Sequence, residues 1–436
     1  MKGFGNKNND INKSKDISIE NRDIPKLINK ALEYHKKNNI EEAKKLYQII
    51  IDRGSKDARV MTNYAIILKD NGQNEKAIKV YKDVIKLYPE RYIAYFNLGN
   101  LFRDYGNLKQ GEYYFKKTIQ LSPKLEIAFI NLANLLAYKG ELEKSNELYL
   151  KCINRENLDI DKKIEIKVSI LINKIVTGDF QTLEAELSET KQLIAKKSIE
   201  HIKDTKIRNN SVSYANFIEQ LFPLLKESSE EEIKTKIPHI GESHCLTFAH
   251  QKLILNCKTR TIQPVLIQGG KAWHFSNNKP NKWKNSLTEQ VKYHQYSDEI
   301  FISFGEIDCR KNEGILSYSK KNNKDHVKVC KKTIKGYVNH MESVLKQLYK
   351  QRYYFGIPAP IIDCELTEEI DLKRKELIEL YNLVLKEEVI ANKCFFVDVY
   401  DLTTNNNKEN NKSYMCDSVH LSPNCLSLLI DKYIYK

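Results

Sequence analysis

Residues 24 to 157 contain a motif that recurs every 34 residues, and this repeat constrains the fold more than any other feature of the chain. Each block has small residues at its eighth and twentieth positions and an aromatic residue at its twenty-fourth. The fifteenth position is glycine in all blocks but the first. Small side chains let two helices approach closely, and glycine suits the turn between them. The pattern therefore predicts two packed helices per block. The four blocks begin at Ile24, Ala58, Tyr92 and Glu126.

This period and these positions resemble the tetratricopeptide repeat family. The resemblance implies a helical solenoid whose concave surface binds a protein or peptide partner. The alternative is an array that only packs on the C-terminal part of its own chain. We expect partner binding.

The segments on either side of the repeats differ from them in composition. Residues 1–23 are polar and rich in Asn and Lys, which is typical of a disordered tail. Residues 158–235 keep a helical apolar pattern without the positions of the repeat, and they predict a capping and linking region that extends through a helix at 214–225.

Charge and cysteine content limit the class of protein. The net charge is +14, and the basic excess is spread over both halves of the chain, so nucleic-acid binding is not the favoured interpretation. The nine cysteines include no Cys-x-x-Cys pair, which favours reduced thiols over a disulfide framework or a zinc site. No stretch reaches the ~20 apolar residues of a membrane span, and residues 1–23 do not resemble a secretory signal. We expect a cytoplasmic protein without a cofactor.

Residues 236–436 change to an alternation of strands and helices, which implies a mainly parallel sheet with helices on both faces. The expected strands are 237–240, 262–268, 299–304, 353–357 and 394–400. The expected helices include 328–349, 367–390 and one that begins at Ser422 and Pro423. The predicted architecture is therefore an α-helical solenoid followed by a three-layer α/β domain of about five strands.

Two short stretches of this domain carry candidate catalytic residues. Ser243 follows the first expected strand in the sequence Gly-Glu-Ser, and Asp417 precedes His420 by three residues. A serine hydroxyl needs an adjacent base to act as a nucleophile. A histidine oriented by a carboxylate is such a base. The alternatives are a serine that caps a helix and an aspartate that caps a turn beside a surface histidine.

These stretches resemble the SGNH, or GDSL-type, hydrolase family. Gly241-Glu242-Ser243 is similar to its first block, Gly-Asp-Ser, with Glu242 as a conservative departure. Residues 417–420 are similar to its last block, Asp-x-x-His, and residues 305–308 occupy the place of its third, Gly-x-Asn-Asp. The resemblance implies a Ser243-His420-Asp417 triad and an esterase or acyltransferase acting on a small ester, such as an O-acetyl group on a carbohydrate.

The third block lacks the asparagine that donates a hydrogen bond to the oxyanion in that family, because its place is taken by Ile307. Arg310 is the nearest candidate to replace this donor, and His244 and Lys271 are weaker ones. Backbone N–H groups of Ser243 and of Gly269 or Gly270 are further candidates; the two glycines stand for the family's second block. Together these residues make up the predicted oxyanion and substrate site.

Asp308 and the aromatic residues near the site have structural interpretations as well. Asp308 is expected to cap a helix or to pair with Arg310 rather than to take part in catalysis. Trp273 and His274 line the pocket or simply pack there. The competing hypothesis for the whole chain is a non-catalytic repeat scaffold whose SGNH-like domain is degenerate.

Overall fold

The computed structural model describes residues 24–155, 158–196, 205–226, 235–361, 369–405 and 410–434. The predicted tail at 1–23 lies outside these residues. Contacts divide the chain into two units, Met1–Leu98 and Gly99–Lys436. No helix of the described part is long and apolar enough to cross a membrane.

Helix pairs form the repeat array, and the first helix of every pair starts where its sequence block starts. The turn residues take the left-handed backbone that the pattern predicts: Gly72 has φ +74° and Gly106 has φ +89°. Tyr81 and Phe115, from the twenty-fourth position, are fully buried. The helices are α1 (Ile24–Lys36), α2 (Ile40–Asp52), α3 (Ala58–Asp70), α4 (Asn74–Leu87), α5 (Tyr92–Asp104), α6 (Leu108–Leu121), α7 (Glu126–Tyr138) and α8 (Leu142–Ile153).

Close packing explains the small residues of the motif. A Cβ atom on Gly99 would lie 2.6 Å from the ring of Phe115, so a larger residue at the eighth position would collide with the aromatic residue of the same block. The helical solenoid predicted from the repeat is confirmed.

Helices α9 (Ile160–Thr177), α10 (Leu183–Lys196) and α11 (Thr205–Lys226) follow the repeats. Their apolar faces form one core together with Cys245, Leu246 and Ala249 of the α/β region. Two hydrogen bonds reinforce this contact. The ring Nε2 of His250 lies 2.8 Å from the carbonyl oxygen of Ile175, and the side-chain amide of Gln263 donates to the carbonyl oxygen of Val176. The region therefore packs on the α/β part as well as linking it to the repeats.

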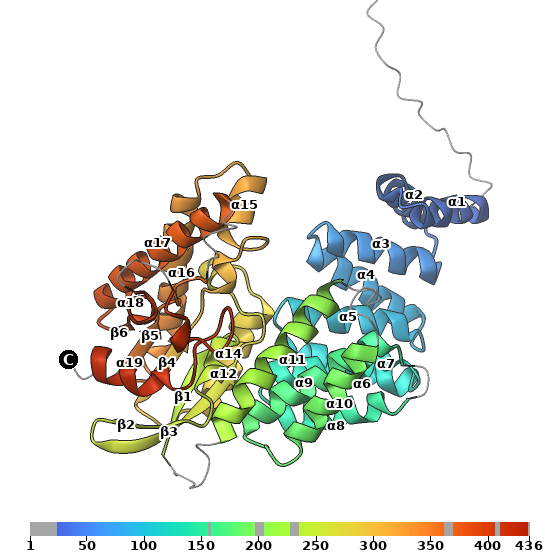
Figure 1. The fold of residues 1–436 in the computed structure, drawn as a ribbon. Coiled ribbons are helices and arrows are strands. Elements are labelled where there is room, and N and C mark those ends of the chain that lie inside the picture. The colour runs from blue at the N-terminus through green and yellow to red at the C-terminus, as the bar shows by residue number, and fades with distance from the viewer. Residues whose placement is uncertain are drawn as a thin grey trace, which may run out of the picture. The chain divides into compact units, whose positions relative to one another are not determined.

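A six-stranded sheet lies at the centre of the C-terminal part, in the order β2-β3-β1-β4-β5-β6 (Figure 1). All neighbours are parallel except β2 and β3. The five strands expected from the sequence are present, but the last is shorter than the expected 394–400, because a helix begins at Val399. The strands are β1 (Lys236–Gly241), β2 (Lys252–Leu255), β3 (Lys258–Leu266), β4 (Glu299–Ser303), β5 (Gln351–Phe355) and β6 (Phe395–Val397).

The strand β2 is absent from the sequence-based prediction of about five strands. It forms a hairpin with β3 through Asn256 and Cys257, which both have positive φ, the backbone pattern of a type I′ turn. An Asn-Cys pair is not the usual sequence signal for that turn. The sheet is therefore mixed rather than wholly parallel.

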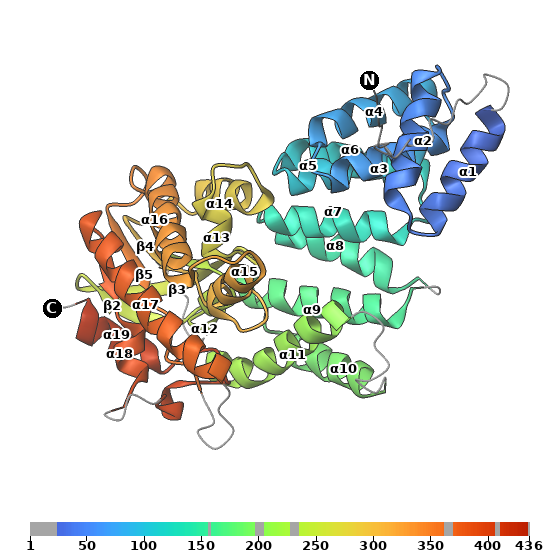
Figure 2. The same cartoon turned by 90° about the horizontal axis from the view of Figure 1, so that it is seen from above.

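Helices cover both faces of this sheet (Figure 2). One face, which includes Ile240, Ile302 and Tyr354, packs on α13, α14, α16 and α17, and the other, which includes Phe301 and Phe355, packs on α19. The last helix starts at Cys425, two residues later than expected. The helices are α12 (His244–Thr247), α13 (Ala272–Ser276), α14 (Lys282–Tyr293), α15 (Ile315–Lys321), α16 (His326–Leu345), α17 (Glu369–Ala391), α18 (Val399–Thr403) and α19 (Cys425–Tyr433).

Candidate functional site

Ser243 lies on a tight turn between β1 and the short helix α12. Gly241 ends the strand, and it must be glycine because a Cβ there would lie 2.5 Å from the carbonyl oxygen of Ser303 on β4. This close approach places the Ser243 turn at the carboxyl edge of the sheet, where ligands bind in folds of this kind. The serine side chain is nearly buried, with 5% of its surface exposed.

Three side chains form a continuous hydrogen-bonded chain at this edge. The Nε2 atom of His420 lies 2.9 Å from the Oγ of Ser243. The other ring nitrogen, Nδ1, lies 2.7 Å from Oδ2 of Asp417. Protonation of Nδ1 leaves Nε2 as the acceptor for the serine proton. The structure thus brings together the three residues that the sequence analysis assigned to a triad.

The contacts of Asp417 fix both the turn and the imidazole. Its Oδ1 accepts hydrogen bonds from the backbone N–H groups of Val419, at 2.7 Å, and His420, at 2.6 Å. Burial acts to raise the pKa of Asp417, but the hydrogen bond and charge of His420 together with these N–H groups lower it to about 2. Asp417 is therefore a carboxylate at neutral pH.

The geometry also bears on the structural alternatives. Ser243 occupies the N-cap position of α12, yet its side chain makes no capping hydrogen bond. His420 is buried, at 8% exposure, and is not a surface histidine beside a capped turn. The side-chain hydrogen bond of Ser243 is the one directed at His420.

Glu242 ties the serine turn to the turn after β4. Its Oε1 accepts hydrogen bonds from the backbone N–H groups of Gly305, at 3.2 Å, and Glu306, at 2.9 Å. Burial and the neighbouring charge of Glu306 raise the pKa of Glu242 well above its ordinary value. The pKa of Glu306 is lowered instead; burial opposes this shift, and the guanidinium of Arg310 outweighs burial. The surroundings thus shift the pKa values of the two carboxyl groups in opposite directions.

Arg310 contacts Glu306, not Asp308. Its Nε donates to Oε2 of Glu306 at 2.8 Å, and a longer contact of 3.4 Å reaches Glu313. The pairing of Asp308 with Arg310 considered from the sequence is therefore wrong. Asp308 accepts hydrogen bonds from the backbone N–H groups of Ala272 and Trp273, and so caps α13.

The remaining candidate donors differ in their availability. The N–H of Gly270 donates to the carbonyl oxygen of Ile267. Those of Ser243 and Gly269 have no acceptor among the described residues. Since Gly241 pairs with Leu266, Ser243 and Gly269 extend from neighbouring parallel strands. Lys271 forms an ion pair with Glu313.

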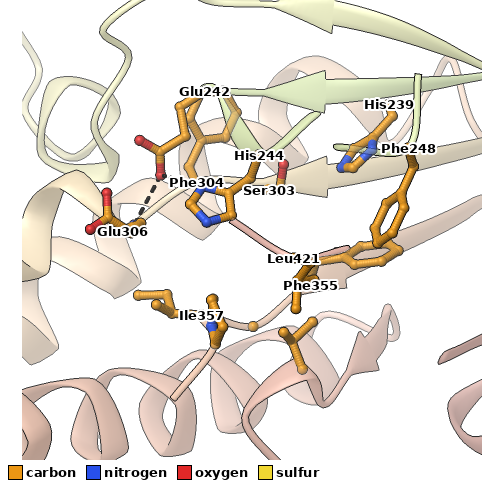
Figure 3. A pocket seen from close by; sticks show the side chains of 13 residues that line it. His239, Glu242, His244, Phe248, Ser303, Phe304, Glu306, Phe355, Ile357 and Leu421 are labelled. Carbon is orange, nitrogen blue, oxygen red and sulfur yellow. Dashed lines mark hydrogen bonds and ion pairs between the residues drawn. The ribbon is translucent and has the colours of Figure 1, made fainter. Parts of the chain in front are cut away.

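A small pocket adjoins the serine turn, and Figure 3 shows the side chains that line it. His244 lines this pocket and also lies beside the triad: its ring lies 4.8 Å from that of His420, and its Nε2 is 3.2 Å from the carbonyl oxygen of Val419. Burial, and next the charge of His420, lower the pKa of His244 to about 4. Burial lowers the pKa of His239, which also lines the pocket, to about 3. Both rings are neutral at pH 7.

Several polar atoms that face this pocket have no hydrogen-bond partner among the described residues. They are both ring nitrogens of His239, Oε2 of Glu242, Nδ1 of His244 and Oγ of Ser303. Buried polar atoms of this kind are normally satisfied by water or ligand. Trp273 and His274 do not line the pocket; Trp273 is 45% exposed, and His274 stacks on Trp283.

Two residues at the site were not singled out in the sequence, and both come from α11. The ring of Phe217 stacks on that of His420, with centroids 3.8 Å apart and planes 21° apart. Tyr214 packs on the core that includes Cys245. The available signal was the spacing of two aromatic residues on one face of an amphipathic helix.

The cysteines and the other metal-ligating side chains show no disulfide or metal site in the described part of the chain. The eight cysteines of the described part are unpaired, and six of them are buried. Within the described ranges, no group of three or more His, Cys, Asp or Glu side chains could hold a metal ion.

Comparison with known proteins supports the repeat array. The tetratricopeptide repeat family matches residues 58–91, the second block. No curated protein matches the chain.

Two solved structures are similar to part of the chain. One is "MamA 41-end from Desulfovibrio magneticus RS-1", at 18% identity and a TM-score of 0.37, with 40% of this chain and 97% of that one covered. Another is the putative kinesin light chain of Podosopora anserina with nearly identical TPR-like repeats, at 14% identity and a TM-score of 0.34, covering 40% of this chain and 95% of that one. The family match to residues 58–91 and the helix pairs α1–α8 together support tetratricopeptide repeats in an N-terminal helical array.

Proposed function

We propose that the C-terminal part of the chain is a serine esterase or O-acyltransferase of SGNH type that acts on a small ester. The observation that carries the proposal is the hydrogen-bonded chain from Ser243 through His420 to Asp417. These groups have the order and contacts of a nucleophile, a base and an orienting acid. The resemblance of their motifs to the SGNH family adds an O-acetylated carbohydrate as the substrate class.

The first half of the reaction transfers the acyl group to the enzyme. Oγ of Ser243 forms a bond to the ester carbonyl carbon while its proton passes to Nε2 of His420, and the carbonyl π electrons move to the oxygen. When this pair returns, the bond to the leaving alcohol breaks and His420 protonates the departing oxygen. Asp417 stabilises the imidazolium throughout.

The second half removes the acyl group. Water, or the hydroxyl group of an acceptor, attacks the acyl-serine and gives its proton to His420. When that intermediate collapses, the bond between Oγ of Ser243 and the acyl carbon breaks, His420 returns the proton to Oγ, and the acid or the new ester leaves. The N–H groups of Ser243 and Gly269, which have no acceptor in the described part of the chain, are proposed donors to the oxyanion in both halves.

The repeats are the part of the chain suited to a protein or peptide partner, since such arrays present an extended surface. The second candidate function follows from this part: a non-catalytic scaffold whose SGNH-like domain is degenerate. It is favoured by the family match to residues 58–91 and by Ile307, which has no donor where the family has one.

A labelling experiment separates the two candidates. The full chain is treated with a fluorophosphonate probe, and hydrolysis of p-nitrophenyl acetate is measured in parallel. The esterase proposal predicts labelling and turnover that are both lost in Ser243→Ala. Equal activity and equal labelling of wild type and Ser243→Ala would leave the scaffold as the better account.

A further inference from the structure

The candidate active site lacks one side-chain donor that its proposed chemistry needs. Removal of one oxyanion donor lowers kcat about 10²–10³-fold in enzymes of this mechanism. Ile307 cannot supply the bond, and the hydrogen bonds of Arg310 go to Glu306 and Glu313. A donor that lies beside Ser243 from another element would fill this role.

Helix α11 reaches the site from outside the sheet. Tyr214 and Phe217 are three residues apart, so they share one face of the helix. Leu221 and Leu225, further along that face, are fully buried in the core shared with Cys245 and Leu246. This packing fixes the height and rotation of α11 over the serine turn.

Tyr214 packs against the core that includes Cys245 and Leu246, which directly follow the serine turn. Burial, followed by the charge of Glu242, raises the pKa of Tyr214, whereas interaction with the hydroxyl of Ser243 lowers it. The phenol is therefore a neutral O–H donor at physiological pH. Because the oxyanion forms on an atom bonded to the carbon that Ser243 attacks, a donor to it must lie beside Oγ.

Phe217 covers the base. Its ring lies almost parallel to the imidazole of His420 at a centroid distance of 3.8 Å, on the same helix face as Tyr214. Asp417 restrains the imidazole in its plane through Nδ1, and Phe217 restrains it from one side.

We infer that α11 completes the active site: Tyr214 is a catalytic residue that donates its hydroxyl hydrogen bond to the oxyanion in place of the missing asparagine, and Phe217 is a positioning residue for His420. This inference rests on the proposed esterase or acyltransferase function. It assigns a catalytic element to the helical region that precedes the α/β part.

The test is Tyr214→Phe in the full chain, which removes one oxygen atom and keeps the ring. We expect kcat for p-nitrophenyl acetate to fall about 10²–10³-fold with little change in KM, since an oxyanion contact forms only in the transition state. Affinity for a boronic acid that forms a tetrahedral adduct with Ser243 should fall with kcat. Tyr293→Phe is the matched control, because Tyr293 is 65% exposed and lies outside the site.

A double variant adds a rescue. Ile307→Asn restores the donor of the family pattern, so it should recover part of the activity of Tyr214→Phe and add little to wild type. If wild type is active and Tyr214→Phe has the same kcat and the same boronic acid affinity, the assignment of Tyr214 is overturned while the esterase proposal stands. If wild type and Ser243→Ala hydrolyse p-nitrophenyl acetate at the same rate, the esterase proposal itself fails.

Phe217 is tested with two substitutions. Phe217→Leu removes the flat ring and should lower kcat up to about tenfold at nearly constant KM, as expected for loss of one stacked aromatic pair. Phe217→Tyr keeps the ring and should retain activity. An equal loss in both variants, or no loss in Phe217→Leu, would overturn the positioning role.

Discussion

Glu242 and the backbone nitrogen of Glu306 lie 2.9 Å apart, so one carboxyl group joins the turn that carries Ser243 to the turn that follows β4. The same oxygen accepts the N–H of Gly305. Gly305 has φ +130°, and a Cβ there would collide with the hydroxyl of Tyr381. The two turns thus depend on each other.

Replacement of Glu242 tests this link. Because burial and Glu306 raise the pKa of Glu242, we expect Glu242→Gln to be nearly as stable as wild type, since an amide oxygen accepts the same N–H groups. Glu242→Ala leaves two buried donors unsatisfied and should lower the free energy of unfolding by about 1–3 kcal/mol. Urea denaturation measures both. A large loss in Glu242→Gln would show that the group functions as a carboxylate.

Asp417→Asn tests the orientation of the base. The amide oxygen can keep the bonds to the N–H groups of Val419 and His420, but an NH₂ group facing Nδ1 favours the wrong tautomer of His420. We expect kcat to fall about 10⁴-fold while the protein stays folded. Steady-state kinetics and circular dichroism check the two parts. Activity within tenfold of wild type would contradict the proposed role of Asp417.

Arg310→Ala tests a structural ion pair. Loss of the guanidinium leaves Glu306, which is 4% exposed, with the longer contact to Arg374 at 3.5 Å. We expect the free energy of unfolding to fall by about 1–3 kcal/mol, because Arg310 is itself partly exposed. The double variant Arg310→Ala/Glu306→Gln should lose less free energy of unfolding than the two single variants lose in sum. A kcat of the folded protein that falls 100-fold would instead indicate a direct role at Ser243.

The pH dependence of stability should report on His239. Its folded-state pKa is lowered to about 3, so below about pH 6.5 the unfolded chain binds a proton that the folded chain does not. Stability therefore falls as pH decreases from about 6.5 toward 3, by about 1.4 kcal/mol per pH unit for this group. His239→Phe removes this contribution. The free energy of unfolding of this variant, relative to wild type, should therefore increase as the pH falls from 6 to 4. Parallel unfolding curves at these pH values would contradict the assignment.

Fragments of the chain test the shared core. The sequence pattern alone suggests that residues 236–436 fold without the helices before them. In the structure, Cys245, Leu246 and Ala249 pack against α9–α11, and His250 and Gln263 bond to carbonyl groups at the end of α9. We expect a fragment of residues 99–436 to be soluble and one of residues 235–436 to aggregate. A monomeric, cooperatively unfolding shorter fragment would refute this.

The repeat was the most predictable part of the fold because each of its positions has one local reason. Glycine at Gly72 and Gly106 allows a left-handed turn, and the helices start where the blocks start. The parallel strands were visible as apolar runs. The hairpin of β2 was not, because Asn256 and Cys257 take positive φ without the glycine that usually marks such a turn.

At the site, residues within short motifs could be predicted from the sequence, whereas contacts that depend on the fold could not. Ser243, Asp417 and His420 stand in motifs that chemistry makes recognisable. The contacts of Arg310 could not be read in the same way, because a flexible cation near several acids pairs with whichever the fold brings closest, here Glu306. Tyr214 and Phe217 look like ordinary core residues of an amphipathic helix until α11 is placed over the serine turn.

The separation of 177 positions between Ser243 and His420 has a consequence for the order of events during synthesis. The serine is made before strands β2 to β6, whereas its partner is made after all of them. A growing chain that has reached β6 therefore carries a serine without a base. If the proposed esterase function holds, its chemistry cannot begin until the segment around Met415 and Leu421, joined by a single β-bridge, has brought His420 to Ser243. Under that proposal, nascent or prematurely terminated copies would carry the nucleophile without the base that activates it.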